Sequence, residues 1–243
     1  MLYIKKLKPS EIVSDEISRV KRELKSVLDK RDPQATRTAF DFLNKNIIRE
    51  NLIKEQHGLC AYCMRRIENN LNMTIEHWQP IEQNVDTALD YENMLGVCDG
   101  GRSFDKSKNK KEDKTHILCC DASKGNKIIT ISPLNPIHMQ KIRYSEDGKI
   151  YTYPQDNTLE KDINEVLHLN GENGLDTNTH LIKNRREAYR SFETFIKKNI
   201  RNGKLSRRVI ENKIKNIESQ ETYDEFAGVI IYLLKRKLKQ FNL

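Results

Sequence analysis

The feature that most constrains this chain is a group of five cysteines between residues 60 and 120. They are Cys60, Cys63, Cys98, Cys119 and Cys120. An odd number of cysteines that includes a C-x-x-C pair favours a metal site over disulfides when no secretory signal is present. The same pair occurs in redox motifs, but there it opens a helix in a βαβ unit, which is not recognisable in this sequence. The cysteines therefore predict a metal site.

Zinc is the metal that these cysteines favour, because structural zinc takes four ligands in a tetrahedron and binds thiolates well. Cys60 and Cys63 supply two ligands from one tight turn. Cys98 is the expected third ligand, and either Cys119 or Cys120 completes the set. A Zn²⁺ ion held in this way would join three separate segments of the chain.

The charge distribution favours a polyanionic partner. The 243 residues include 43 Lys and Arg against 35 Asp and Glu, which gives a net charge of +8. From Lys183 onward, sixteen Lys and Arg face seven Asp and Glu. Such an excess suits a phosphate backbone, although each charge is also compatible with an ordinary solvated helix face. Nucleic acid is therefore the partner that we expect.

Several classes of protein are disfavoured by the sequence. No run approaches the roughly 18 apolar residues of a membrane span. The first residues lack the apolar core of a secretory signal, and no P-loop is present, so any dependence on ATP would come from a partner. We expect a cytoplasmic protein without a membrane partner.

Hydrophobic periodicity predicts mostly helices with a few short strands. Helices are expected over 11–31 and 35–55, and again through most of 162–243. Strands are expected at 73–77 and 128–132, and a β-hairpin is expected around Asp147-Gly148. Residues 90–98 indicate a short helix or turn, and the polar segment 99–119 indicates an exposed loop.

Four short motifs carry a resemblance to a known family. Their order is CAYC, TIEHWQP, YENMLGVC and CCDASKG, which resembles the order in HNH, or ββα-metal, endonucleases. In that family a C-x-x-C pair precedes an acidic residue and His, then an Asn, then two further cysteines, the last of which opens a helix. The resemblance implies zinc ligands at Cys60, Cys63, Cys98 and Cys120, with Cys120 chosen by its spacing from Lys124-Gly125.

The chain departs from the family pattern at the second pair of cysteines. Family members have few residues between them, whereas here the inserted loop 99–119 intervenes. That insertion leaves Cys119 and His116 as substitutes for the fourth ligand. Asp121 also stands where His or Asn is more common, which preserves an oxygen ligand for a hard cation.

The resemblance also implies the catalytic residues. Phosphodiester hydrolysis needs a base for water and a cation for the developing charge. The implied roles are His77 as general base, Glu76 and Asp121 as ligands of Mg²⁺ or Mn²⁺, and Asn93 as the residue that orients the His77 loop. Glu76 and His77 are adjacent on a strand, so both would act at one site only if the strand is irregular or the backbone participates. A buried histidine without a catalytic role is the alternative.

Two lysines near the last motif are candidate nucleic-acid contacts. Lys124 and Lys127 lie close to the expected helix that follows Cys120, and exposed amides with the helix dipole favour phosphate there. Solvated lysines are the alternative reading for both.

A second, longer resemblance covers residues 55–190. The series CAYC, EHWQP, CCDASKGN, PLNP, VLHLN and NRR is similar to PtuB-type HNH proteins, which accompany the ABC-type ATPase PtuA in Septu and retron-linked phage defence. The similarity implies a toxic effector that acts with such an ATPase. A retron reverse transcriptase and its msDNA are further candidate partners.

Together these observations predict a predominantly helical α+β protein with four segments. They are an N-terminal helical segment 1–55, an HNH nuclease module 56–130, a β-hairpin extension 131–160 and a basic helical region 161–243. The expected function is a metal-dependent endonuclease that prefers DNA, with RNA such as tRNA as the second substrate. The alternative is a zinc-dependent nucleic-acid-binding or adaptor subunit without catalytic activity.

Overall fold

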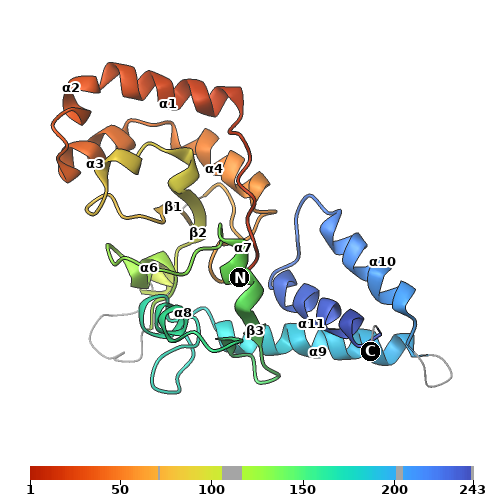
Figure 1. Ribbon diagram of the computed structural model, residues 1–243. Coiled ribbons are helices and arrows are strands. Elements are labelled where there is room, and N and C mark those ends of the chain that lie inside the picture. Colours follow the sequence, from red (N-terminus) through yellow and green to blue (C-terminus); the bar gives the residue numbers. More distant parts are fainter. Residues whose placement is uncertain (71, 106–116, 201–204, 242–243) are drawn as a thin grey trace.

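The computed structural model describes residues 1–70, 72–105, 117–200 and 205–241. These residues form a mostly helical α+β fold with two small antiparallel sheets of two strands each (Figure 1). At this level the predicted fold class is confirmed. None of the helices in the described ranges is long and apolar enough to cross a membrane.

The N-terminal segment is helical, but each expected helix is divided in two. The elements are α1 (Glu11–Glu23), α2 (Lys25–Leu28), α3 (Pro33–Asp41) and α4 (Lys45–Glu55). Asp32 starts α3 by accepting a hydrogen bond from the Ala35 N–H at 2.7 Å, and Asn44 starts α4 in the same way through Asn46. Asn and Asp side chains satisfy the free N–H groups of a first helical turn, so these two residues begin new helices rather than continue old ones.

The first sheet pairs β1 (Met73–His77) with β2 (Met94–Cys98), and Met73 lies opposite Cys98. The expected strand at 73–77 is thus confirmed. The expected helix or turn over 90–98 is wrong for its second half, because the short 3₁₀ turn η2 (Tyr91–Asn93) is followed at once by β2. All of β2 is buried. A strand covered on both faces lacks the alternation that would have identified it.

Further single helical turns lie between β1 and β2 and after β2. They are η1 (Val85–Thr87), α5 (Arg102–Asp105) and α6 (Asp121–Lys124). The helix expected after Cys120 is therefore only one turn long, and Gly125 ends it with a φ of +52°. Most of the inserted loop 99–119, including His116, lies outside the described residues.

The second sheet is the hairpin predicted from Asp147-Gly148. It consists of β3 (Ile142–Tyr144) and β4 (Ile150–Thr152), and α7 (Pro136–Lys141) leads into it. The strand expected at 128–132 is absent from this described stretch. Its backbone N–H groups at Thr130 and Ile131 donate instead to the Asp162 carboxylate at 2.6 and 2.8 Å. A side chain has therefore replaced a strand partner.

The C-terminal region is helical, as predicted. Its elements are α8 (Asn157–Lys161), the π-helical turn η3 (Asp162–Val166), α9 (Leu181–Asn199), α10 (Arg207–Glu218) and α11 (Ala227–Lys239). Helix α11 packs against both α9 and α10, and these three lie together on one side of the molecule (Figure 1). Its start also reaches the cysteine region, since Gly228 packs directly against Met64.

Buried residues from all four predicted segments belong to one hydrophobic core, for example Val13, Ile75, Ile150 and Leu234. A buried arginine reinforces this packing. Arg185 of α9 donates to the Gly148 carbonyl at 2.7 Å and to the Leu169 carbonyl at 2.6 Å. A guanidinium without solvent needs such acceptors, so the hairpin turn is fastened to α9.

The hairpin turn supplies a test of this packing. A Cβ on Gly148 would lie 2.2 Å from the Ile182 carbonyl oxygen, whereas Gly174, at a similar positive φ, has open space around it. Gly174→Ala should cost only the left-handed backbone strain of about 1–2 kcal/mol. Gly148→Ala should cost that strain plus a displacement of α9, for a total of about 3–4 kcal/mol. Urea denaturation followed by circular dichroism measures both, and equal losses would contradict the contact.

Candidate metal centre and histidine site

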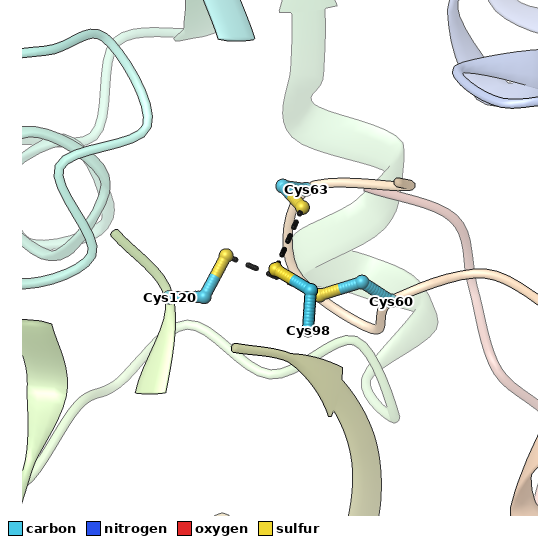
Figure 2. A group of neighbouring side chains, drawn as sticks. All are labelled: Cys60, Cys63, Cys98 and Cys120. Carbon is cyan, nitrogen blue, oxygen red and sulfur yellow. Dashed lines mark hydrogen bonds between the residues drawn. The ribbon is translucent and has the colours of Figure 1, made fainter. Parts of the chain in front are cut away.

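The C-x-x-C turn is shaped by backbone hydrogen bonds. Cys60 N–H donates to the Arg65 carbonyl at 2.8 Å, and Met64 N–H donates to the Cys60 carbonyl at 3.0 Å. Met64 has a φ of +66°, which reverses the chain. The thiols of Cys60 and Cys63 both face the sulfur atoms of Cys98 and Cys120 (Figure 2).

Gln56 fixes this turn to the first sheet. Its side-chain amide donates to the carbonyls of Leu59 and Gly96 at 2.8 Å each, and its oxygen accepts from the Gly96 N–H at 2.7 Å. Gln56 is buried, so these bonds are not in competition with water. The result is that the first two cysteines are held at a set position relative to β2 and Cys98.

Four sulfur atoms converge from three segments. The Sγ atoms of Cys60, Cys63, Cys98 and Cys120 all lie within 4.8 Å of one another (Figure 2). Two of these separations are 3.6 Å for Cys63 to Cys98 and 3.9 Å for Cys60 to Cys120. Zinc to thiolate bonds of about 2.3 Å place the sulfurs of a tetrahedron about 3.8 Å apart. The spacing is consistent with a structural zinc site.

Cys119 is not part of this group, although it is adjacent to Cys120. Its Sγ lies 3.3 Å from the Thr179 hydroxyl. The backbone turns sharply between the two, because Cys120 has a φ of +56°. Gly100 permits this arrangement, since a Cβ there would lie 2.2 Å from the Cys119 carbonyl oxygen. Of the two cysteines that the sequence left open, the structure brings Cys120 to the group.

The four thiols require a cation to ionise together. All are buried and none forms a disulfide. Burial raises the pKa of the Cys63 thiol well above its ordinary value, because an isolated thiolate is poorly solvated there. Zinc supplies two positive charges to the sulfurs at once and converts them to thiolates. The buried cluster is therefore consistent with a structural Zn²⁺.

His77 lies at the end of β1, half-buried against α3. Its ring packs edge-on against Phe40 with centroids 4.6 Å apart. Its Nε2 lies 2.8 Å from the Ala88 carbonyl oxygen. A carbonyl oxygen only accepts, so Nε2 carries the proton and Nδ1 carries the lone pair of the neutral ring. Burial lowers the pKa of His77, which keeps the ring neutral near pH 7.

Asn93 secures the loop that supplies this carbonyl. Its side-chain oxygen accepts from the Gln79 N–H at 2.8 Å. Its amide donates to the Gln79 carbonyl at 3.0 Å and to the Thr87 carbonyl at 3.3 Å. Thr87 directly precedes Ala88, so Asn93 positions the acceptor of His77 through the loop.

Glu76 and Asp121 lie close together, as their predicted roles require. Burial and the nearby Asp121 carboxylate together raise the pKa of Glu76 to about 8, and Lys124 opposes this shift. The Lys124 ammonium lies 2.6 Å from Glu76, and Arg102 lies 3.0 Å from Asp121. Each carboxylate thus has a cationic side chain as its neighbour.

One sequence-based expectation needs correction. Lys124 does not lie where it could contact phosphate, because its side chain has no exposed surface and its ammonium is already bound to Glu76. Lys127, by contrast, is exposed. The strand is regular through the pairs of Glu76 with Leu95 and His77 with Met94, so of the two conditions left open for the acidic-histidine pair only participation of the backbone is compatible with it. The two side chains therefore contact different neighbours on opposite faces.

Three contributors to the His77 environment come from elsewhere in the sequence. Phe40 packs on the ring, the Ala88 carbonyl fixes its tautomer, and the Arg37 guanidinium is close enough to lower its pKa. Arg37 also bonds Asn126 at 3.2 Å. No motif indicates Arg37 or Phe40, since α3 is more than thirty residues before His77 in the chain.

No family model matches the chain. No curated protein matches it either.

The cysteine geometry can be tested with two neighbouring substitutions. Cys120→Ser should remove zinc, because the hydroxyl is a much poorer ligand than thiolate. Cys119→Ser should retain about one zinc per chain, since its Sγ lies outside the four-sulfur group and contacts the Thr179 hydroxyl. Zinc content measured by inductively coupled plasma mass spectrometry on purified protein separates the two. Zinc loss in the Cys119 variant alone would reverse the assignment.

Proposed function

We propose that this chain is an HNH-type, metal-dependent endonuclease that hydrolyses phosphodiester bonds of nucleic acid. DNA is the substrate that we place first, and RNA such as tRNA second. The observation that carries the proposal is the state of His77. A neutral imidazole with its proton fixed on Nε2 by the Ala88 carbonyl presents Nδ1 as a base.

The proton transfer follows from that tautomer. Nδ1 accepts a proton from a water molecule as the water oxygen attacks phosphorus, the bond from phosphorus to the leaving ester oxygen breaks, and that oxygen takes a proton from solvent. The Ala88 carbonyl stabilises the imidazolium that forms. Asn93 holds the loop that carries Ala88. Asn93 is therefore a positioning residue in this proposal, as the resemblance implies.

A divalent cation is the second requirement. Mg²⁺ or Mn²⁺ bound by Glu76 and Asp121 would stabilise the negative charge that develops on the phosphate. The donor set fits such an ion, because the two carboxylates are buried and close enough for Asp121 to raise the pKa of Glu76. A cation relieves the repulsion between them.

Basic side chains near the site and on the C-terminal helices support a nucleic-acid substrate. Arg37 lies near His77, and Lys127 is exposed shortly after α6. Helices α9, α10 and α11 carry many more basic residues. Phosphate contacts of this kind position a substrate without reading its sequence.

The biological role that we propose is a toxic effector in defence against phage. It comes from the resemblance of the motifs to PtuB-type proteins, and it implies an ABC-type ATPase of the PtuA type as partner. A retron reverse transcriptase with its msDNA would be a further partner. Co-expression tests this role: the chain alone should slow bacterial growth, and the ATPase should relieve that toxicity until phage infection.

A non-catalytic zinc-dependent binding or adaptor subunit is the second candidate. It is favoured by one observation, which is that both members of the acidic-histidine pair already have structural partners. His77 packs on Phe40 and bonds Ala88, and Glu76 pairs with Lys124. A domain that only binds nucleic acid would need nothing more.

Cleavage by a His77→Ala variant separates the two candidates. Removal of a general base should lower the cleavage rate by about a hundredfold or more while zinc is retained. The matched control is His180→Asn, at an exposed histidine with a left-handed backbone, which should cleave like the unchanged chain. Plasmid, single-stranded DNA and total tRNA are offered with Mg²⁺ or Mn²⁺. Equal cleavage by all three proteins would show that His77 is not the base. Absence of cleavage by the unchanged chain under every condition would favour the binding subunit.

A further inference from the structure

The side chain of Lys124 occupies an unusual position. It has no exposed surface, and its ammonium lies 2.6 Å from the Glu76 carboxylate and 3.1 Å from the His77 carbonyl oxygen. Lysine is among the residues least often buried in full, because its charge is strongly hydrated in water. A fully buried lysine needs acceptors that replace its hydration, and here these are the Glu76 carboxylate and the His77 carbonyl oxygen.

The atoms around the ammonium are those that a hard cation selects. Mg²⁺ and Mn²⁺ take carboxylate and carbonyl oxygens, and here the ammonium holds one of each. The second carboxylate, Asp121, lies close to Glu76 and is bound by Arg102 at 3.0 Å. The two acidic residues of the proposed cation site are therefore both neutralised by side chains of the chain itself.

We propose that the Lys124 ammonium and a divalent cation bind Glu76 in a mutually exclusive manner, so that the Lys124 side chain blocks the cation site. This inference rests on the proposed function, because it concerns the cation that the nuclease would use. A divalent cation and an ammonium cannot share one carboxylate oxygen in a buried site without strong repulsion. The cation binds only when the ammonium withdraws.

The position of Lys124 in the fold gives it a way to withdraw. Helix α6 is a single turn that begins after the zinc ligand Cys120 and ends at Lys124, and the residues from Gly125 to Ile128 are exposed. The Ser123 hydroxyl of α6 donates to the Val166 carbonyl at 2.7 Å. Helix α6, which carries Lys124, is therefore connected directly to η3 in the C-terminal region. A partner that moved this contact would also move Lys124.

Manganese binding in the absence of nucleic acid tests whether the Lys124 ammonium competes with the cation. The zinc-loaded chain is titrated with Mn²⁺ by calorimetry, and Lys124→Met is compared with Lys141→Met. The control removes a lysine that also pairs with a carboxylate, Asp156, at 2.8 Å on the surface of the hairpin region. Lys124→Met should bind Mn²⁺ at least about tenfold more tightly than the unchanged chain, since the competing cation is gone. Lys141→Met should not differ from the unchanged chain.

Addition of Glu76→Gln to Lys124→Met should abolish the gained affinity. Equal affinity of the unchanged chain and folded Lys124→Met would overturn the inference. Since no nucleic acid is present, this result is independent of cleavage, and an inactive chain that still shows the gain would refute only the proposed nuclease.

A measurement on the unchanged chain covers the case in which Lys124→Met does not fold. Acetylation of lysines by an N-hydroxysuccinimide ester, read by mass spectrometry, should leave Lys124 protected in the absence of Mn²⁺ because it is buried. Saturating Mn²⁺ should expose it to the reagent, while Lys127 is modified in both conditions. Protection of Lys124 that is unchanged by Mn²⁺ would overturn the inference.

Discussion

The convergence of four thiols is the constraint on which the rest of the site depends. Cys60 and Cys63 come from a turn after α4, Cys98 ends β2, and Cys120 precedes α6. None of these segments has a large sheet or a long helix to hold it in place. A tetrahedral ion that binds all four would supply that restraint, since metal binding contributes directly to the stability of small folded units. The same ion would set where β1 and α6 meet.

Where β1 and α6 meet, the two faces of strand β1 make different contacts. Adjacent strand residues face opposite sides, so Glu76 points to the buried side with Tyr62 and Lys124, and His77 points toward Phe40 and Ala88. The Lys124 ammonium contacts both residues, through a carboxylate of one and a carbonyl of the other. Lys124 thus connects Glu76 to the backbone of His77 and not to its imidazole, because the two side chains of a regular strand point to opposite faces.

Sequence patterns anticipated the elements that depend on local chemistry. Alternating apolar residues predicted the strand at 73–77, and Asp147-Gly148 predicted the hairpin turn. The observed strand pairs confirm both. The patterns failed where distant atoms decided the outcome. Residues 94–98 form a strand because they pair with β1, and Thr130 and Ile131 donate to Asp162 rather than to another strand. Periodicity contains no information on such partners.

By itself, the sequence determined the candidate residues: the cysteines by residue type and spacing, and the acidic-histidine pair and the middle asparagine by resemblance to a known motif order. Only the tertiary structure decided which of them come together. It brought Cys120 rather than Cys119 to the sulfur cluster, because the backbone reverses between them. It also turned Lys124 inward to Glu76. Direction and burial of a side chain depend on contacts between segments far apart in the chain, and no local pattern specifies those contacts.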